Sequence, residues 1–102
     1  MIETVEDRYG NSVYLTDERW DHIIEFHEEM IGCRDHILTT LKQGRRNQDS
    51  IDPSVYTYSH PFDGLEKGYN HVIVVVKIGF REIEEDEKSN NFVLTAYQKF
   101  LY

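Results

Sequence analysis

The longest apolar run in the chain, residues 72–76, reads V-I-V-V-V. Branching at Cβ favours a pleated strand over a helix, and a strand that is apolar on both faces needs cover on both or a place inside a sheet. We therefore expect residues 72–78 to form the central strand. Alternation places Lys77 on the face of Ile73 and Val75, with Val74 and Val76 on the other.

Three further segments alternate in the manner of strands: 13–15, 55–59 and 92–97. The acidic segment 84–88 predicts the solvated turn of an antiparallel hairpin that brings 92–97 beside the central strand. Within 92–97, alternation predicts that Phe92, Leu94 and Ala96 share one face and that Val93, Thr95 and Tyr97 share the other. Tyr56 and Tyr58 are likewise expected to share a face.

Helical periodicity begins after Thr16, a suitable N-cap followed by two acidic residues. We expect a helix from Asp17 to a break at Gly32, then a second helix at 33–43 capped by Gly44. Residues 1–8 are expected to be a loosely held start and 45–50 a polar linker. The apolar stripe of the first helix consists of Trp20, Ile23, Ile24, His27 and Ile31.

This order of elements contains no strand–helix–strand alternation, which argues against a parallel, doubly wound sheet. The sequence predicts one domain, residues 1–102, of the α+β class. Its N-terminal helices are expected to pack on one face of a mostly antiparallel sheet of three to four strands.

Charge and cysteine content narrow the functional classes. The net charge of −8 opposes nonspecific binding to nucleic acid, although Lys42, Arg45 and Arg46 form a local basic cluster. The single cysteine, Cys33, permits no intramolecular disulfide, which favours the cytoplasm. No segment approaches the roughly 20 apolar residues of a membrane span, so no membrane association is expected.

Motif searches favour neither a metal nor a cofactor. His22 and His27 are five positions apart, off the i, i+4 spacing of a helical zinc site, and no glycine-rich phosphate loop occurs. His27 is either a satisfied histidine at the core edge or a site residue. Lys77, Thr95 and Tyr97 share one predicted face, where they either bind an anion or serve as a surface lysine and ordinary strand formers.

The order of several segments resembles the phage-associated nuclease-like domains grouped with barnase, EndoU, colicin and RelE ribonucleases, known as the BECR fold. The segments are 13–23, V-Y-L-T-D-E-R-W-D-H-I; 26–30, F-H-E-E-M; the polar turn with D-S-I at 49–51; the tyrosine-rich strand; V-V-V-K at 74–77; and F-V-L-T-A-Y at 92–97. The resemblance implies a barnase-like sheet and metal-independent RNA cleavage by attack of the ribose 2′-hydroxyl on the adjacent phosphate.

By position, the resemblance implies His27 as the acid or base, Lys77 as the cation on the phosphoryl oxygens, and Thr95 and Tyr97 as hydrogen-bonding partners. It implies an RNA substrate and a cognate inhibitor or antitoxin as partners. A noncatalytic interaction module stays open as the alternative, with an acidic hairpin at 82–87 and a tyrosine-rich docking face. The predicted substrate-binding residues are Arg19, Tyr56, Tyr58 and His60.

Overall fold

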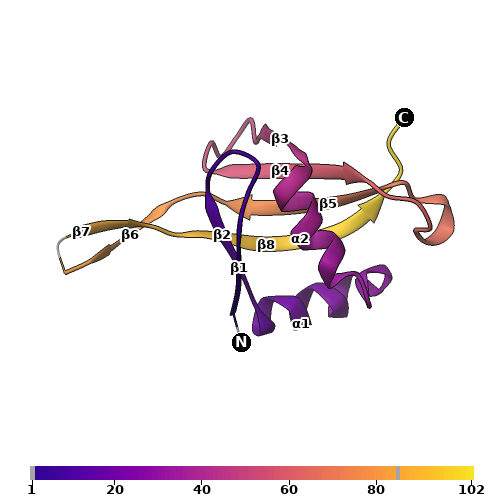
Figure 1. Cartoon of the computed structure of the whole chain (residues 1–102), viewed down its shortest axis with the longest axis horizontal. Helices are drawn as coiled ribbons and strands as arrows, with labels where there is room; N and C mark the ends of the chain where they lie inside the picture. The colour runs from indigo at the N-terminus through magenta and orange to yellow at the C-terminus, as the bar shows by residue number, and fades with distance from the viewer. Residues whose placement is uncertain (1, 85) are drawn as a thin grey trace.

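The computed structural model describes residues 2–84 and 86–102, without the side chains at 81–83, 86 and 87. A six-stranded sheet has the strand order β1-β2-β8-β5-β4-β3, and two α-helices accompany it (Figure 1). The elements of this sheet and its helices are β1 (Ile2–Glu6), β2 (Ser12–Thr16), α1 (Asp17–Phe26), α2 (Arg34–Gln43), β3 (Arg45–Gln48), β4 (Val55–Pro61), β5 (His71–Lys77) and β8 (Asn91–Lys99). Two short 3₁₀ helices, η1 (Glu28–Met30) and η2 (Glu66–Gly68), and a separate ribbon of β6 (Phe80–Ile83) and β7 (Asp86–Ser89) complete the fold.

The expected central strand is confirmed. β5 lies between β4 and β8 and is antiparallel to both, so its backbone is hydrogen-bonded on two sides. Val72, Val74 and Val76 are fully buried on the face that α2 covers. The predicted return of 92–97 beside this strand is also correct, because every residue of β5 pairs with a residue of β8.

The expected number of strands and the expected antiparallel arrangement of the sheet are wrong. The sheet has six strands rather than three to four, and it is mixed because β2 runs parallel to β8. It is therefore larger than the barnase-like sheet that the resemblance implied. The strands that the sequence did not reveal are β1, expected as a loose start, and β3, expected as a linker. Both are edge strands with one neighbour, and their polar composition carries little of the apolar signal of a covered strand.

A β-bulge changes the predicted faces of β8. Val75 pairs with Thr95, but the next residue, Val76, pairs with Val93, so Leu94 is the extra residue. The shift turns Val93 into the core and leaves Phe92 opposite Lys77 on the other face. The prediction that Val93 shares a face with Thr95 is thus wrong, because a one-residue shift exchanges the faces of every residue before it.

Helix α1 begins as predicted and ends early. The Thr16 hydroxyl accepts a hydrogen bond from the Arg19 amide at 3.0 Å, which caps the helix. The chain leaves the helical conformation at His27, whose φ is −133°, five residues before the expected end. The following turn buries Met30 completely and leaves Ile31 65% exposed. Ile31 therefore does not belong to the apolar stripe.

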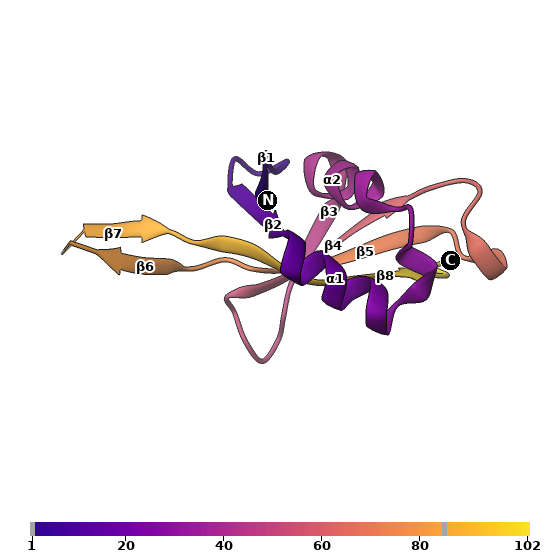
Figure 2. The same ribbon diagram turned by 90° about the horizontal axis from the view of Figure 1, so that it is seen from below.

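Helix α2 packs across β4 and β5 on one face of the sheet (Figures 1 and 2). Ile37 and Leu41 are fully buried in this interface. Gly44 ends the helix as predicted, and a Cβ there would lie 2.4 Å from the Thr40 carbonyl oxygen and 2.7 Å from that of Ser59. Only glycine therefore allows the helix end to approach β4 this closely. We call this side of the sheet the covered face and the other side the open face.

The hairpin after β5 extends well away from the core. Strands β6 and β7 continue β5 and β8 as a two-stranded ribbon (Figure 2). The predicted hairpin is present, but part of the segment expected as its turn, 84–88, is strand β7. Glu85, in the predicted acidic tip, lies outside the described residues.

Candidate functional site

The open face unites the predicted catalytic residues on one side of the sheet. Register places Lys77 opposite Phe92, Val75 opposite Thr95, and Ile73 opposite Tyr97, so these side chains project from the same face. Helix α2 lies on the opposite side of the sheet, and α1 runs beside β8 (Figure 2). Lys77, Thr95 and Tyr97 are partly exposed at this face, whereas Ile73 is buried.

His27 reaches this face from the end of α1. Its ring lies against the Tyr97 ring, with centroids 5.5 Å apart and planes inclined by 33°. The His27 side chain is 34% exposed, and its Nδ1 atom lies 3.9 Å from the Glu29 carboxylate. The exposed part of the ring stays open to a ligand. The structure thus brings together residues separated by seventy positions in the sequence.

The remaining catalytic candidates extend in a line from this contact. Thr95 lies one alternating position from Tyr97, and Lys77 lies four residues along β5 from Ile73, the partner of Tyr97. At a rise of about 3.3 Å per residue, Lys77 is about 13 Å along the strand from the Tyr97 position. The face therefore suits an extended ligand better than a single phosphate held by all of them.

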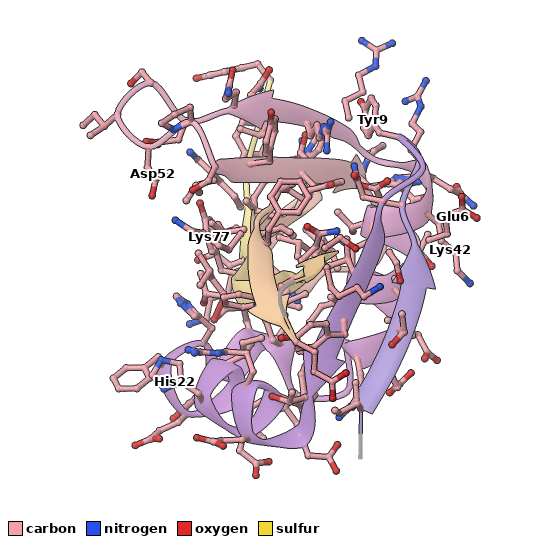
Figure 3. All side chains as sticks on the ribbon, turned by 90° about the vertical axis from the view of Figure 1, so that its left-hand side faces the viewer. Glu6, Tyr9, His22, Lys42, Asp52 and Lys77 are labelled. Carbon is pink, nitrogen blue, oxygen red and sulfur yellow. The ribbon has the colours of Figure 1, made fainter. Side chains whose placement is uncertain are left out.

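Lys77 has a partner at the other border of the face. Its Nζ atom donates a hydrogen bond to the Asp52 carboxylate at 3.0 Å, from the loop between β3 and β4. Hydrogen bonds from Ser54 and then Lys77 lower the pKa of Asp52 to about 2. Figure 3 shows Lys77, Asp52 and His22 on one side of the molecule, with Tyr9 and Lys42 on the other. The Lys77 charge is partly offset yet remains exposed.

Arg19 lies in a pocket between α1, β2 and β8. This pocket has a volume of about 600 Å³ and adjoins Lys77, because Phe92 in its lining is the cross-strand partner of that lysine. Three acidic side chains of α1 share the lining with Arg19. The lining residues are Tyr14, Thr16, Glu18, Arg19, Asp21, His22, Glu25, Phe92 and Val93.

The other predicted substrate-binding residues are not on the open face. Tyr56, Tyr58 and His60 pair with Val76, Val74 and Val72, and so project toward the covered face. Tyr58 is fully buried and cannot stack on a base. The His60 ring contacts the Gln43 amide oxygen and the Pro61 carbonyl, both at 3.1 Å, and burial lowers its pKa.

Sequence reasoning missed a polar cluster on the covered face. The Asp7 carboxylate is completely buried and accepts hydrogen bonds from the Tyr58 hydroxyl and the Asn11 amide. The Arg46 guanidinium lies 3.6 Å from Asp7, and its central carbon lies 4.3 and 4.2 Å from the ring centroids of Tyr9 and Tyr56. The cluster joins the β1–β2 turn to β3 and β4. Asp7 lies in a turn, and its local sequence does not indicate that it pairs with the distant residues Tyr58 and Arg46.

No family model matches this chain, and neither the curated proteins nor the solved structures contain a significant match. Among residues 2–84 and 86–102, no helix is long and apolar enough to cross a membrane. Within the same residues, no three side chains of His, Cys, Asp or Glu are arranged to hold a metal ion.

Proposed function

We propose that the open face binds single-stranded RNA and cleaves it without a metal ion. One observation supports this proposal above all others: His27, Lys77, Thr95 and Tyr97, identified from sequence alone, lie along a single accessible face, and two of them are in contact. They come from α1, β5 and β8, so local sequence does not account for their common placement. The roles proposed for these residues follow the order of segments that resembles the nuclease-like domains.

In the proposed reaction the ribose 2′-oxygen forms a bond to phosphorus, and the bond from phosphorus to the 5′-oxygen breaks. Neutral His27 takes the proton of the 2′-hydroxyl. The 5′-oxygen leaves as an alcohol after taking a proton from water, and His27 returns its proton to the resulting hydroxide. The products are a 2′,3′-cyclic phosphate and a 5′-hydroxyl. The hydroxyls of Thr95 and Tyr97 donate hydrogen bonds to the phosphoryl oxygens as negative charge develops.

The separation of about 13 Å along β5 gives Lys77 a different role from the one first expected. Lys77 binds a phosphate beyond the scissile one and holds the chain in register, while His27 and Tyr97 act at the scissile phosphate. Asp52 orients the Lys77 ammonium at 3.0 Å and reduces its net contribution to affinity. An extended single strand satisfies both ends of this face.

Because few basic side chains lie near the open face, the proposal predicts a weak dependence of RNA binding on salt concentration. Among the side chains that the structure describes, Lys77 and Arg19 are the basic ones that adjoin the binding path, which corresponds to two neutralised phosphates. For single strands the slope of log K against log salt is about −0.7 per neutralised phosphate, which predicts a slope of about −1.4. Lys77→Ala is expected to reduce the magnitude of this slope to about 0.7.

The direct test is cleavage of end-labelled single-stranded RNA in the presence of a chelator. His27→Ala is expected to lower the rate about 10²- to 10⁴-fold, the usual contribution of general acid–base catalysis. The matched control is His36→Ala on α2, because His36 packs against Phe62, away from the open face. Circular dichroism confirms folding of both variants.

A rate in the His27→Ala protein equal to that of wild type would refute the catalytic assignment. Failure of folded wild-type protein to cleave any of a set of mixed-sequence RNAs would refute the nuclease proposal itself. Detection of a 2′,3′-cyclic phosphate end by mass spectrometry distinguishes this mechanism from hydrolysis by attack of water.

A second candidate function is binding of a basic protein partner by the projecting ribbon. The observation that favours it is the separation of the β6–β7 ribbon from the six-stranded sheet, because an isolated two-stranded hairpin is only marginally stable in water. The segment 82–87 is rich in acidic residues, which would attract a basic partner. Glu82→Gln/Glu87→Gln should then weaken capture of that partner, and unchanged capture would exclude this surface.

A further inference from the structure

The pocket beside α1 has an aromatic floor. The rings of Tyr14 and Phe92 lie 5.9 Å apart at 35°, on neighbouring strands where β2 meets β8. The Tyr14 hydroxyl donates a hydrogen bond to the Asn90 side-chain oxygen at 2.8 Å, which fixes its ring. Both residues are only partly buried, so ring surface is available to a ligand.

The wall of the pocket is a row of carboxylates. Glu18, Asp21 and Glu25 follow one another at spacings of three and four residues, which places them on the same side of α1. Among residues 2–84 and 86–102, none of these three carboxylates and no atom of the Arg19 guanidinium takes part in an ion pair. Acceptors, one cation and an aromatic floor are therefore all available to a ligand.

We infer that this pocket binds an RNA base with an exocyclic amino group, and that it discriminates against uracil. This inference rests on the proposed function. Ionised carboxylates only accept hydrogen bonds, and the amino groups of adenine, cytosine and guanine donate them, whereas uracil presents two exocyclic acceptors, which carboxylates repel, beside its single N3–H donor. Carboxylates also repel phosphate, so the base, not the backbone, enters the pocket.

The position of the pocket fits this order of contacts. Phe92 lies on its floor and is directly opposite Lys77, so a base stacked on Phe92 has its phosphate near the Lys77 ammonium. Arg19, on the α1 side, is available to the phosphate on the other side of the same nucleotide. The volume of about 600 Å³ is within the usual range for small-ligand pockets. The pocket thus lies at the Lys77 end of the open face, about 13 Å along β5 from the position opposite Tyr97.

The test uses oligonucleotides that cannot be cleaved. Synthetic 2′-deoxy hexamers of adenine, cytosine or uracil lack the attacking hydroxyl, so binding is measured by fluorescence anisotropy separately from catalysis. We expect the adenine and cytosine hexamers to bind at least 5-fold more tightly than the uracil hexamer. A triple variant, Glu18→Gln/Asp21→Asn/Glu25→Gln, should reduce this ratio toward one, because amides also donate to uracil oxygens.

A second variant addresses stacking. Phe92→Ala should weaken binding of all hexamers roughly 5- to 150-fold, the range for loss of one base–aromatic stack. Phe92→Leu keeps most of the volume, should fold if the alanine variant does not, and should still weaken binding. The control is Phe100→Ala, because Phe100 is 53% exposed outside the pocket.

Equal binding of the three hexamers by wild-type protein would overturn the inference, as would an unchanged ratio in the triple variant. RNA cleavage without base preference would overturn the base pocket and leave the nuclease proposal standing. A retained preference for adenine and cytosine hexamers, with no cleavage of any RNA, would overturn the nuclease proposal and support the pocket.

Discussion

Tyr58 and Tyr97 lie on opposite faces of one sheet and have opposite surroundings. Tyr58, on the covered face, is fully buried, and its hydroxyl is bonded to the buried Asp7 carboxylate. Tyr97, on the open face, is partly exposed and contacts the ring of His27. Two tyrosines with the same strand propensity therefore serve a core and a candidate site.

The comparison separates residues that stabilise the fold from residues available for binding. On the covered face the polar side chains of Asp7, Arg46 and His60 have partners within the protein. On the open face Thr95 and Tyr97 retain exposed surface, and the Lys77 side chain remains 37% exposed. Substitutions on the covered face should mainly change stability, and those on the open face should mainly change binding.

The largest expected loss of stability comes from Gly44→Ala, at the junction of α2 and the covered face. The new Cβ would lie 2.4 Å from the Thr40 carbonyl oxygen, so the helix end and β4 must separate. We expect a loss of about 3 kcal/mol, the upper part of the usual overpacking range. Gly79→Ala is the control, because the nearest atom to its Cβ would be the Asn90 oxygen at 3.8 Å. Equal urea midpoints for the two variants would contradict this prediction.

The next effect compares neighbouring residues of β5 on the two faces. Val74 is fully buried on the covered face, and Val75 is partly exposed on the open face. Val74→Ala removes two carbons from the core and should cost about 2–3 kcal/mol of unfolding free energy. Val75→Ala should cost under about 1 kcal/mol, because less apolar surface is lost. Urea unfolding measures both values, and a larger cost at Val75 would reverse the assignment of faces.

Replacement by phenylalanine, which removes only the hydroxyl, should affect stability differently at Tyr58 and at Tyr97. Tyr58→Phe removes a donor to the buried Asp7 carboxylate and should cost about 1–3 kcal/mol, while Tyr97→Phe should leave stability unchanged. Burial and the Asp7 contact raise the pKa of Tyr58 above its usual value near 10. Because the folded pKa is raised, wild-type stability should fall above about pH 10, where the unfolded tyrosine ionises. The stability of the Tyr58→Phe variant should fall less steeply with pH. Urea denaturation at pH 8 and pH 11 measures the difference.

Apolar periodicity predicted the centre of the fold and not its borders. Val72 to Val76 determined β5, and Thr16 determined the start of α1, because burial and capping leave local sequence signals. β1 and β3 gave no such signal, since an edge strand requires a partner on one side alone. The parallel contact of β2 with β8 consists of only two residue pairs and depends on tertiary packing.

The site was predictable where alternation held. Lys77, Thr95 and Tyr97 fell on one face as expected, because even spacing preserves the face within each strand and the register pairs Val75 with Thr95. The bulge at Leu94 places Phe92 on the same face as Lys77, and the sequence around Leu94 contains no signal that predicts a bulge. The pocket beside α1 and the Asp7 cluster depend on this register and on long-range contacts, so they emerged only from the structure.

The smallest expected effect concerns the charge pair at the border of the open face. The pKa of Asp52 is lowered to about 2, chiefly by Ser54 and then by Lys77. A lowered folded pKa stabilises the protein above the unfolded value near 3.8, and this contribution is lost as pH falls from about 4 through 2. Ser54→Ala should therefore raise the pKa of Asp52 more than Lys77→Ala does, with little effect on stability at pH 7 because exposed pairs contribute little. Carbon-detected NMR titration of the Asp52 carboxyl measures both shifts, and a larger shift in the Lys77→Ala protein would show that the ion pair, not the loop hydroxyl, holds this carboxylate in place.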